Sequence, residues 1–353
     1  MRWRRRSTLE RASLARPLVL RGRLWVGEGT TYDDGCVVVD TDGLVSACGE
    51  RASVDVPFGA FEVSAGWLGP GIVDEHVHLA FGDPEHVLRH GVVEVCDLGA
   101  PPADAVRFRQ LDAPHTRVAG PLLTAPGGYP SRSWGSGGFA AFVDEAEQTR
   151  RLVSGLVTQV DVVKVALEPH GGSVPSVELV RAIVDAAHAA DLPVVAHALS
   201  VGMVERALDA AVDRLAHTPT EALPAELIAR LVESRTTVVS TLHTFVASGD
   251  GQAAVDNAAA IVAAGGTLHY GTDLGNAHTR PGAEPRELAL LAHEVGLGAE
   301  GALRTATHPL RVGEPARLVA LPADPHDGFE ALRHPVAVVC GATALLQEPP
   351  EVG

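Results

Sequence analysis

The order of hydrophobic and polar residues differs between the two ends of the chain and its middle. Between residues 17 and 64, short apolar runs alternate with turn residues, and Thr41-Asp42-Gly43 separates two of these runs. An Asp-Gly pair between alternating runs is a strong signal for a β-hairpin. Similar runs return between residues 313 and 350, in ARLVALPADP and PVAVVCGATALL. We therefore predict one small β-rich domain that is built from both ends of the chain.

Residues 65–312 show a second pattern, in which β-branched runs alternate with stretches rich in alanine and leucine at helical spacing. The sequences that we interpret as strands are GIVDEHVHL, VVEVCDLG, TRVAGPLLT, DVVKVAL, PVVAHAL, RLAH, TTVVSTLH and LHYGTD. Helical stretches, among them SVELVRAIVDAAHAA and VDNAAAIVAAG, lie between several of them. Eight strands that alternate with helices predict an α/β fold of the (β/α)8 or TIM barrel type.

The main alternative for this middle part is a doubly wound open sheet. Such a sheet usually carries a glycine-rich phosphate turn directly after its first strand. The nearest candidate in this chain, Gly127-Gly128, follows a later predicted strand and lacks the required glycine spacing. The barrel is therefore the favoured fold.

The composition fits a soluble enzyme that acts on a small molecule. The length of 353 residues suits a barrel with a small appended domain. Hydrophobic residues make up 46% and charged residues 20%, as in ordinary globular proteins. A net charge of −16 argues against binding to nucleic acid or anionic lipid, because both would repel the chain. No window approaches the roughly 18 apolar residues that a membrane-spanning helix needs.

Two further features predict a cytoplasmic protein. The basic run at residues 2–6 is not followed by the apolar stretch of a signal peptide, so we interpret it as a loose tail. The four cysteines are Cys36, Cys48, Cys96 and Cys340. They lack CxxC spacing and are too few for a disulfide framework, which predicts reduced thiols. The sequence is compatible with a homo-oligomer but does not define the oligomeric state.

Residues with metal-binding side chains recur on the predicted barrel strands. His76 and His78 are two positions apart, so their side chains point to the same face of a strand and can chelate one cation. At the ends of further predicted strands we expect Lys164, His197, His217 and Asp273. The successive intervals after His78 are 86, 33, 20 and 56 positions, which suit strands 1, 4, 5, 6 and 8 of a barrel.

Each of these six residues, here called the predicted ligands, also has a structural interpretation when taken alone. A lysine can pack its stem against apolar neighbours, a histidine can be hydrogen-bonded in the core, and an aspartate can cap a loop. Together they are harder to explain in that way, because charged groups in a barrel interior are costly without a compensating partner. Since active sites of such barrels lie at the carboxyl ends of the strands, we predict one shared metal site.

The order of these motifs resembles a known family. HVH after GPGIVD, K in VVKVA, H in VVAHA, H in RLAH and D in GTD resemble the ligand set of the amidohydrolase superfamily, binuclear type with a carboxylated lysine. HGVVEVCDLGAP, GGSVPSVELVRAIVDAAHAADLPVVAHA and a helix at ALRTATHPLRVG are also similar. The resemblance is greatest to the imidazolonepropionase-like and prolidase-like branch. It implies a catalytic barrel at residues 65–312 and a composite β-sandwich domain from residues 17–64 and 313–350.

The resemblance also implies a mechanism. The first histidine pair would bind one divalent cation with Asp273, and the two later histidines would bind a second. Lys164 would bridge both cations after carbon dioxide converts its amine to a carbamate, which makes Lys164 and Asp273 the catalytic residues. A metal-bridging hydroxide would attack the carbonyl of a small amide, cyclic amide or dipeptide-like substrate. The nitrogen and oxygen ligands favour Zn²⁺, with Mn²⁺ or Co²⁺ as alternatives.

Substrate contacts are expected from the loops at the strand ends. The candidates are Tyr129, His170, His243, Asn276, His278 and Arg280. The guanidinium of Arg280 is a candidate clamp for a substrate carboxylate, because it can donate two parallel hydrogen bonds.

Three segments depart from the pattern of the family. Leu199 stands where many relatives have a second histidine after the strand-5 ligand. The loop sequence Gly127-Gly128-Tyr129-Pro130 replaces a GGHG motif, and LGNAHTRPGAEP after Asp273 is individual. All three segments lie where the substrate would be contacted, so the resemblance does not define the substrate.

Other functions remain open at this stage. A lactonase or another ester hydrolase could use the same hydroxide. A deaminase is less favoured, because deaminating relatives usually bind one metal and lack the lysine that stands here as Lys164. A non-catalytic barrel that only binds a ligand or has a structural role is disfavoured because all six ligand positions are filled.

Overall fold

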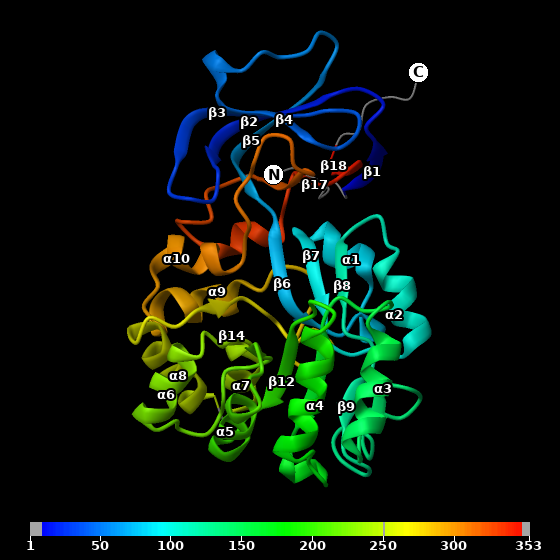
Figure 1. The fold of residues 1–353 in the computed structure, drawn as a ribbon. Coiled ribbons are helices and arrows are strands. Elements are labelled where there is room, and N and C mark those ends of the chain that lie inside the picture. The colour runs from blue at the N-terminus through cyan, green and yellow to red at the C-terminus, as the bar shows by residue number, and fades with distance from the viewer. Residues whose placement is uncertain (1–8, 250, 348–353) are drawn as a thin grey trace.

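The structure is a computed structural model that describes residues 9–249 and 251–347, and the predicted tail at residues 2–6 lies outside this part. Figure 1 shows a β-rich part that contains strands from both ends of the chain, next to a larger part in which strands are surrounded by helices. This arrangement confirms the predicted α/β barrel with an additional β-rich domain.

The β-rich part is one eight-stranded sheet with the order β1-β18-β17-β16-β5-β2-β3-β4. Its strands are β1 (Glu10–Ser13), β2 (Leu18–Trp25), β3 (Thr31–Val39), β4 (Val45–Glu50), β5 (Phe61–Pro70), β16 (Arg317–Leu321), β17 (Ala337–Cys340) and β18 (Thr343–Leu346). All neighbours are antiparallel except β2 and β5, which are parallel. Buried side chains from strands of both chain ends form one apolar core between them.

The predicted hairpin connects β3 and β4. The carboxylate of Asp40 accepts hydrogen bonds from the backbone N–H groups of Asp42, at 3.0 Å, and Leu44, at 2.9 Å. Gly43 has φ +79°, and a Cβ at this position would lie 2.2 Å from the backbone of Gly341. The turn therefore requires glycine both for its left-handed backbone and for its close contact with the C-terminal strands.

Eight parallel strands form the barrel. They are β6 (Ile72–Val77), β7 (Val92–Asp97), β8 (His115–Val118), β11 (Val163–Leu167), β12 (Val194–Ala198), β13 (Arg214–Leu215), β14 (Thr237–Val239) and β15 (Leu268–His269). Each overlaps one of the eight segments predicted as strands. The segment TRVAGPLLT, predicted as one strand, is divided into β8 and β9 (Leu122–Thr124), and β10 (Ala140–Phe142) pairs with β9. Backbone hydrogen bonds close the ring: Asp161 donates to Val118 at 2.8 Å, and Glu75 donates to Tyr270 at 3.0 Å.

Helices cover the outside of the barrel (Figure 1). They are α1 (Pro84–Arg89), α2 (Pro102–Arg109), α3 (Ala146–Leu156), α4 (Val177–His188), α5 (Val201–Asp209), α6 (Ala225–Glu233), α7 (Leu242–Ser248), α8 (Gln252–Ala263), α9 (Pro285–Ala289) and α10 (Gly298–Thr305). In α4, the buried residues Val180, Ile183, Val184 and Ala187 follow the helical period and face the barrel. The predicted helix at ALRTATHPLRVG is only partly helical, because α10 ends at Thr305, before the proline of this segment.

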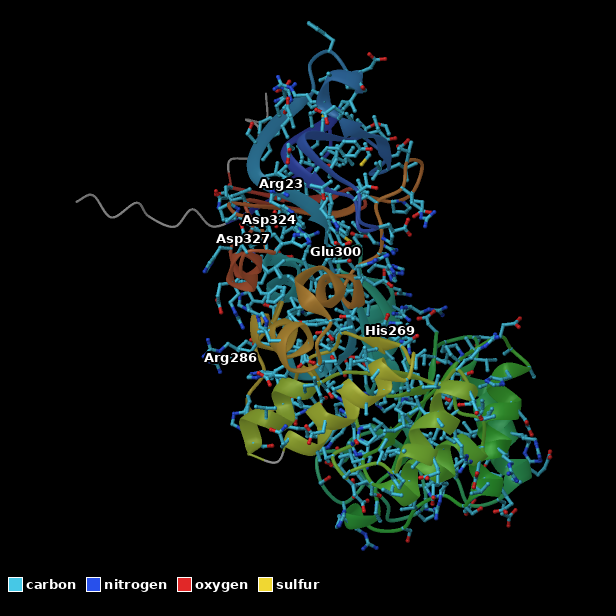
Figure 2. All side chains as sticks on the ribbon, turned by 90° about the vertical axis from the view of Figure 1, so that its left-hand side faces the viewer. Arg23, His269, Arg286, Glu300, Asp324 and Asp327 are labelled. Carbon is cyan, nitrogen blue, oxygen red and sulfur yellow. The ribbon has the colours of Figure 1, made fainter. Side chains whose placement is uncertain are left out.

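The β-rich part packs directly on the barrel. Trp25 and Trp67 belong to the same continuous apolar core as the barrel residues, with ring centroids 6.2 Å apart. The ring of His326 meets that of Trp25 edge-on at 5.3 Å. Figure 2 shows Arg23 close to Asp324, and the Arg23 Nε lies 3.5 Å from the Asp324 carboxylate. The ring contacts and the ion pair lie within the β-rich part, and the continuous apolar core joins this part to the barrel.

Two further predictions concern the state of the cysteines and the lack of a membrane-spanning helix. All four cysteines are free, and Cys36, Cys96 and Cys340 are buried, as predicted for reduced thiols. Across residues 9–249 and 251–347, the helices are too short or too polar to cross a lipid bilayer.

Candidate metal centre and active site

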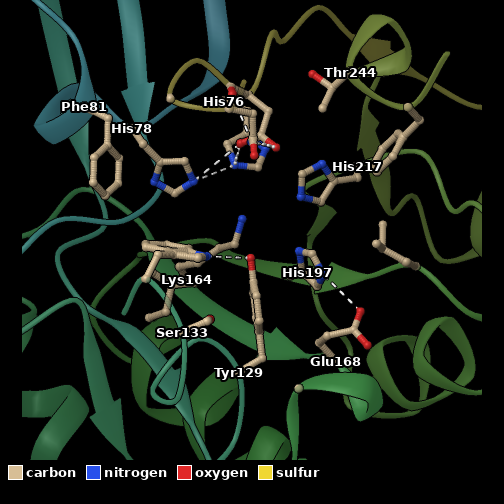
Figure 3. Close-up of a pocket in the computed structure, with 18 of the residues that line it drawn as sticks. His76, His78, Phe81, Tyr129, Ser133, Lys164, Glu168, His197, His217 and Thr244 are labelled. Carbon is tan, nitrogen blue, oxygen red and sulfur yellow. Dashed lines mark hydrogen bonds and ion pairs between the residues drawn. The ribbon is translucent and has the colours of Figure 1, made fainter. Parts of the chain in front are cut away.

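A cavity of about 700 Å³ opens at the carboxyl ends of the barrel strands. All six predicted ligands line it, although they come from five strands or the loops that follow them. Figure 3 shows the imidazole rings of His76, His78, His197 and His217 around the Lys164 amine. The residues that the spacing argument selected therefore lie together at one end of the barrel.

The first histidine pair and Asp273 form a compact group of ligand atoms. The Nε2 atoms of His76 and His78 are 3.4 Å apart. One carboxylate oxygen of Asp273 lies 3.3 Å from the Nε2 of His76 and 3.5 Å from that of His78. All three residues are buried, and one ligand atom from each lies within 4.8 Å of the others. This geometry is suitable for a single cation.

Strand β6 reaches this geometry through an irregularity that simple alternation does not predict. Its pairing with β7 shifts register between Asp74 and Val77. As a result Glu75 and His76, although adjacent, both reach into the barrel. Glu75 bonds to Arg117 and Arg214 from two other strands, both at 2.6 Å, whereas His76 lines the cavity. Such β-bulges re-aim side chains and are frequent next to active sites.

Asp74 connects strand β6 with the segment that follows β15 and contains Asp273. Its buried carboxylate accepts a hydrogen bond from the backbone of His76 at 3.1 Å. It also accepts from the backbone and the hydroxyl of Thr272, at 3.0 and 2.6 Å. Because Thr272 precedes Asp273, one carboxylate fixes the backbone beside two predicted ligands.

Backbone carbonyl groups determine which nitrogen of the first two histidines faces the cavity. The Nδ1 of His76 lies 2.8 Å from the carbonyl oxygen of Ala216, and the Nδ1 of His78 lies 3.2 Å from that of Gly99. A carbonyl only accepts hydrogen bonds, so in both rings Nδ1 carries the proton and Nε2 keeps its lone pair for a cation.

The other two histidines are held by side chains. The Nδ1 of His217 lies 3.0 Å from the Thr241 hydroxyl, which leaves Nε2 free. The Nε2 of His197 lies 3.4 Å from the Glu168 carboxylate, which leaves Nδ1 as the nitrogen that faces the cavity. Partners of this kind orient metal-binding imidazoles in many metalloproteins. The centroids of the two rings are 4.8 Å apart.

Two non-glycine residues at the site have left-handed backbone. Asp273 has φ +54° and Thr241, which contacts His217, has φ +45°. Such conformations are costly for residues with a Cβ and cluster at functional sites. Gly271 is also required, because a Cβ there would lie 2.3 Å from the Val239 side chain.

Lys164 is the second residue of β11, so it is not at the end of its strand as predicted. Its long side chain reaches the cavity from inside the barrel, and only 1% of the residue is exposed. Burial lowers the pKa of the Lys164 amine to about 7, against the opposing effect of the Asp273 carboxylate. Burial likewise raises the pKa of Asp273, against the charge of Lys164. Both shifts favour the neutral forms.

The four histidines are also held neutral. Burial is the main cause, and the nearby Lys164 charge acts in the same direction. The pKa values of His76 and His217 lie well below the usual value, and that of His78 falls to about 4. Neutral imidazoles are the form that binds metal ions.

The sequence profile of the amidohydrolase family matches residues 67–308, which is more than half of the chain. The chain belongs to this family. The resemblance noted from the ligand motifs is thereby confirmed, and the protein is a metal-dependent hydrolase that acts on carbon–nitrogen bonds.

Solved structures of other proteins share the fold of this amidohydrolase along nearly its whole length. A Xaa-Pro dipeptidase with bound methionine is 18% identical, with a TM-score of 0.79, and the match covers 93% of this chain and 99% of that one. A prolidase complexed with N-methylphosphonate-L-proline is 22% identical (TM-score 0.79, coverage 94% and 100%). The ochratoxinase of A. niger is 19% identical (TM-score 0.79, coverage 96% and 97%). No curated protein matches this chain in sequence.

The amidohydrolase cavity contains only part of the predicted substrate-binding set. Tyr129, His170 and Asn276 line it. His243 instead lines a separate hollow beside α9, and His278 and Arg280 are exposed outside the cavity wall. The amide of Asn276 donates to Asp273 at 2.6 Å, so this residue positions a predicted ligand.

Several residues of the site were not predicted from the sequence. Glu168 directly follows strand β11, and the rule that expects site residues at strand ends could have identified it. Trp134 lines the cavity from the loop between β9 and β10, where no periodic pattern exists. Its indole N–H donates to the Tyr129 hydroxyl at 2.9 Å. The composition also draws attention to Lys164, because it is the only lysine in the chain.

Proposed function

We propose that this amidohydrolase binds two divalent cations at the floor of its cavity and hydrolyses the amide bond of a small amide, cyclic amide or dipeptide-like molecule. The observation that carries the proposal is the convergence of four neutral imidazoles, one aspartate and one buried lysine on a single cavity. A single residue of one of these types can have a purely structural role. A buried group of six, in which hydrogen bonds already orient the imidazole rings, is typical of a metal site.

The donor set fits the metal chemistry of the family. His76, His78 and Asp273 would hold one cation, because their free Nε2 and carboxylate atoms already lie within 3.5 Å of one another. His197 and His217 would hold the second through the ring nitrogens that have no other partner in the site. Nitrogen and oxygen ligands without a thiolate suit Zn²⁺, and Mn²⁺ or Co²⁺ could replace it.

Lys164 would bridge both cations as a carbamate. An ammonium between two dications would be strongly repelled, but a carbamate provides two anionic oxygens. The reaction with carbon dioxide requires a neutral amine, and burial favours that form here. The composition adds an independent argument: all other basic side chains apart from histidine are arginines, which cannot take this role.

Bound divalent cations would polarise the substrate carbonyl and lower the pKa of a water molecule so that it can attack near neutral pH. Asp273 would accept the proton of this water and deliver it to the leaving nitrogen. The hydrogen bond from Asn276 to one carboxylate oxygen leaves the other oxygen toward the histidine pair.

Tyr129 would donate a hydrogen bond to the substrate carbonyl oxygen. Its hydroxyl already accepts a hydrogen bond from Trp134, so the hydroxyl proton is free to point to another acceptor in the cavity. Burial raises the pKa of Tyr129 to about 12, which keeps the phenol protonated. Its ring also lies 5.1 Å from that of His197.

The proposal is tested with protein loaded with Zn²⁺ or Mn²⁺ and a panel of N-acyl amino acids, dipeptides, cyclic amides and lactones. We expect hydrolysis of an amide, which disappears in His217→Asn. His86→Asn is the matched control, because His86 is exposed on α1 away from the cavity. Turnover of lactones without any amide would support the ester-hydrolase alternative, and full activity of His217→Asn would contradict the proposed second site.

A further inference from the structure

The cavity wall is unusually rich in aromatic side chains. The chain has only 8 phenylalanines, 4 tryptophans and 3 tyrosines, yet four of these residues line this one cavity. They are Phe81, Tyr129, Trp134 and Phe245. Phe81 is 51% exposed at the mouth, and its ring centroid lies 5.9 Å from that of Trp134. Together the four rings give the cavity a largely apolar, aromatic lining, which is typical of sites that bind small apolar groups.

The aromatic rings stand directly beside the proposed metal ligands. The centroid of Trp134 is 5.2 Å from that of His78, and the centroid of Phe245 is 5.5 Å from that of His217. Figure 3 shows Phe81 and Tyr129 next to the same group of histidines. A substrate whose carbonyl lies at the ligands would therefore place its neighbouring groups against aromatic faces.

The charges of the wall argue against an anionic substrate group. Among the described residues that line the cavity, Lys164 is the only lysine or arginine, and its buried amine lies among the four histidines. Arg280, predicted as a carboxylate clamp, is exposed outside the wall. The Glu168 carboxylate is also part of the wall, and it lies 3.4 Å from the Nε2 of His197. The wall therefore has no guanidinium that could pair with a carboxylate on a group that flanks the scissile amide.

We propose that the groups that flank the scissile amide in the substrate are uncharged and apolar, either aryl or branched alkyl. The inference rests on the proposed function for the position of the carbonyl. It separates this site from one that recognises the free carboxylate of a dipeptide. It also assigns Trp134 and Phe81 as specificity-determining residues.

Binding is measured with three 4-substituted phenylacetones, which are ketone isosteres of acetanilides because CH2 replaces the amide NH and prevents hydrolysis. The substituents are methoxymethyl, carboxymethyl and trimethylammoniomethyl, so the ligands differ mainly in charge. Dissociation constants are determined by calorimetry with the full-length, metal-loaded protein. We expect the methoxymethyl ligand to bind at least about tenfold more tightly than the carboxymethyl ligand, because burial of an unpaired charge is costly.

Two substitutions test the assigned residues. Trp134→Ala and Phe81→Ala should each weaken binding of the methoxymethyl ligand by about tenfold, whereas Trp134→Phe should retain most of the affinity. Phe58→Ala is the matched control, because Phe58 is a fully exposed aromatic residue of the β-rich part.

Equal or tighter binding of either charged ligand would overturn the inference, and so would the absence of measurable binding by the neutral one. The inference would also be overturned if the Arg280→Gln protein lost affinity for the carboxymethyl ligand, because Arg280 would then bind the carboxylate of the ligand. The corresponding three acetanilides are assayed separately for release of the aniline. Failure of this hydrolysis would count against the proposed function, while the ketone affinities would still decide the inference.

Discussion

Replacement of Asp273 by asparagine tests the proposed proton transfer at a single atom. The substitution keeps the size of the side chain and one oxygen that can accept from Asn276, which now bonds to the carboxylate at 2.6 Å. The new amide cannot accept the proton of the attacking water. General acid–base groups contribute about 10² to 10⁴ in rate. At 1.36 kcal/mol per tenfold, we expect the activation free energy to rise by about 2.7 to 5.4 kcal/mol.

The assay measures kcat and metal content on the same sample, because Asp273 is also a proposed ligand. Asp213→Asn is the control, since this carboxylate accepts from the backbone of Val194 at 2.7 Å, at the opposite end of strand β12. The control should change stability but keep the metal and kcat. An Asp273→Asn protein with full metal content and kcat within about threefold of wild type would refute the shuttle role.

The pH dependence gives a second readout of the same group. Asp273 acts as a base only when ionised, so activity is lost as the pH falls through its pKa. Burial raises this pKa to about 6, while bound cations act in the opposite direction. We therefore expect the acid limb of kcat/KM below about pH 6, and its absence in the residual activity of Asp273→Asn. An acid limb that persists unchanged in the variant would belong to another group.

Three further substitutions address the supporting residues. Asn276→Ala removes the hydrogen bond to Asp273, so kcat should fall by about tenfold or more with metal content unchanged; loss of metal instead would make Asn276 a determinant of binding. Glu168→Gln should lower metal affinity at the second site by about 10- to 100-fold in a chelator competition, because the carboxylate orients His197; unchanged affinity would contradict this role. Glu75→Gln should lower the free energy of unfolding in urea by about 3 kcal/mol, because Arg117 and Arg214 both lose their ion pair with this buried carboxylate. A change below about 1 kcal/mol would show that the network contributes little.

The fold could be predicted because the period of the apolar residues is a physical consequence of the secondary structure. Each barrel strand from β6 to β15 lies in an apolar run that is flanked by helical spacing, and α4 shows the predicted buried stripe. The short strand β13, with two residues, lies within the predicted strand segment RLAH. The end of α10 was missed because a helical pattern gives little information on its boundary.

The positions of the predicted ligands followed from the barrel geometry, but their local environment did not. The register shift in β6 brings Glu75 and His76 to the same interior, which strict alternation excludes. The depth of Lys164 depends on the length of its side chain rather than on its place in the strand. Both features result from tertiary packing, which sequence spacing does not report.

The residues of the cavity wall outside the ligand set are the hardest to predict from sequence because they lie on loops. Trp134 and Arg280 are both large side chains in glycine-rich or proline-rich segments, and only the structure separates the one in the wall from the one in solvent. Loops lack a periodic pattern, so the direction of a side chain cannot be inferred from its neighbours. The aromatic wall was therefore visible only in three dimensions.

The central claim is that Lys164 bridges two cations as a carbamate, and the composition allows a direct test. Because the chain has one lysine, carbamate formed on a side-chain amine can come only from this residue. We would record the 13C NMR spectrum of metal-loaded protein equilibrated with 13C-bicarbonate. The account predicts one slowly exchanging carbamate signal, which disappears in Lys164→Ala together with about half of the bound metal. A wild-type protein with full metal content and turnover but no such signal would contradict it.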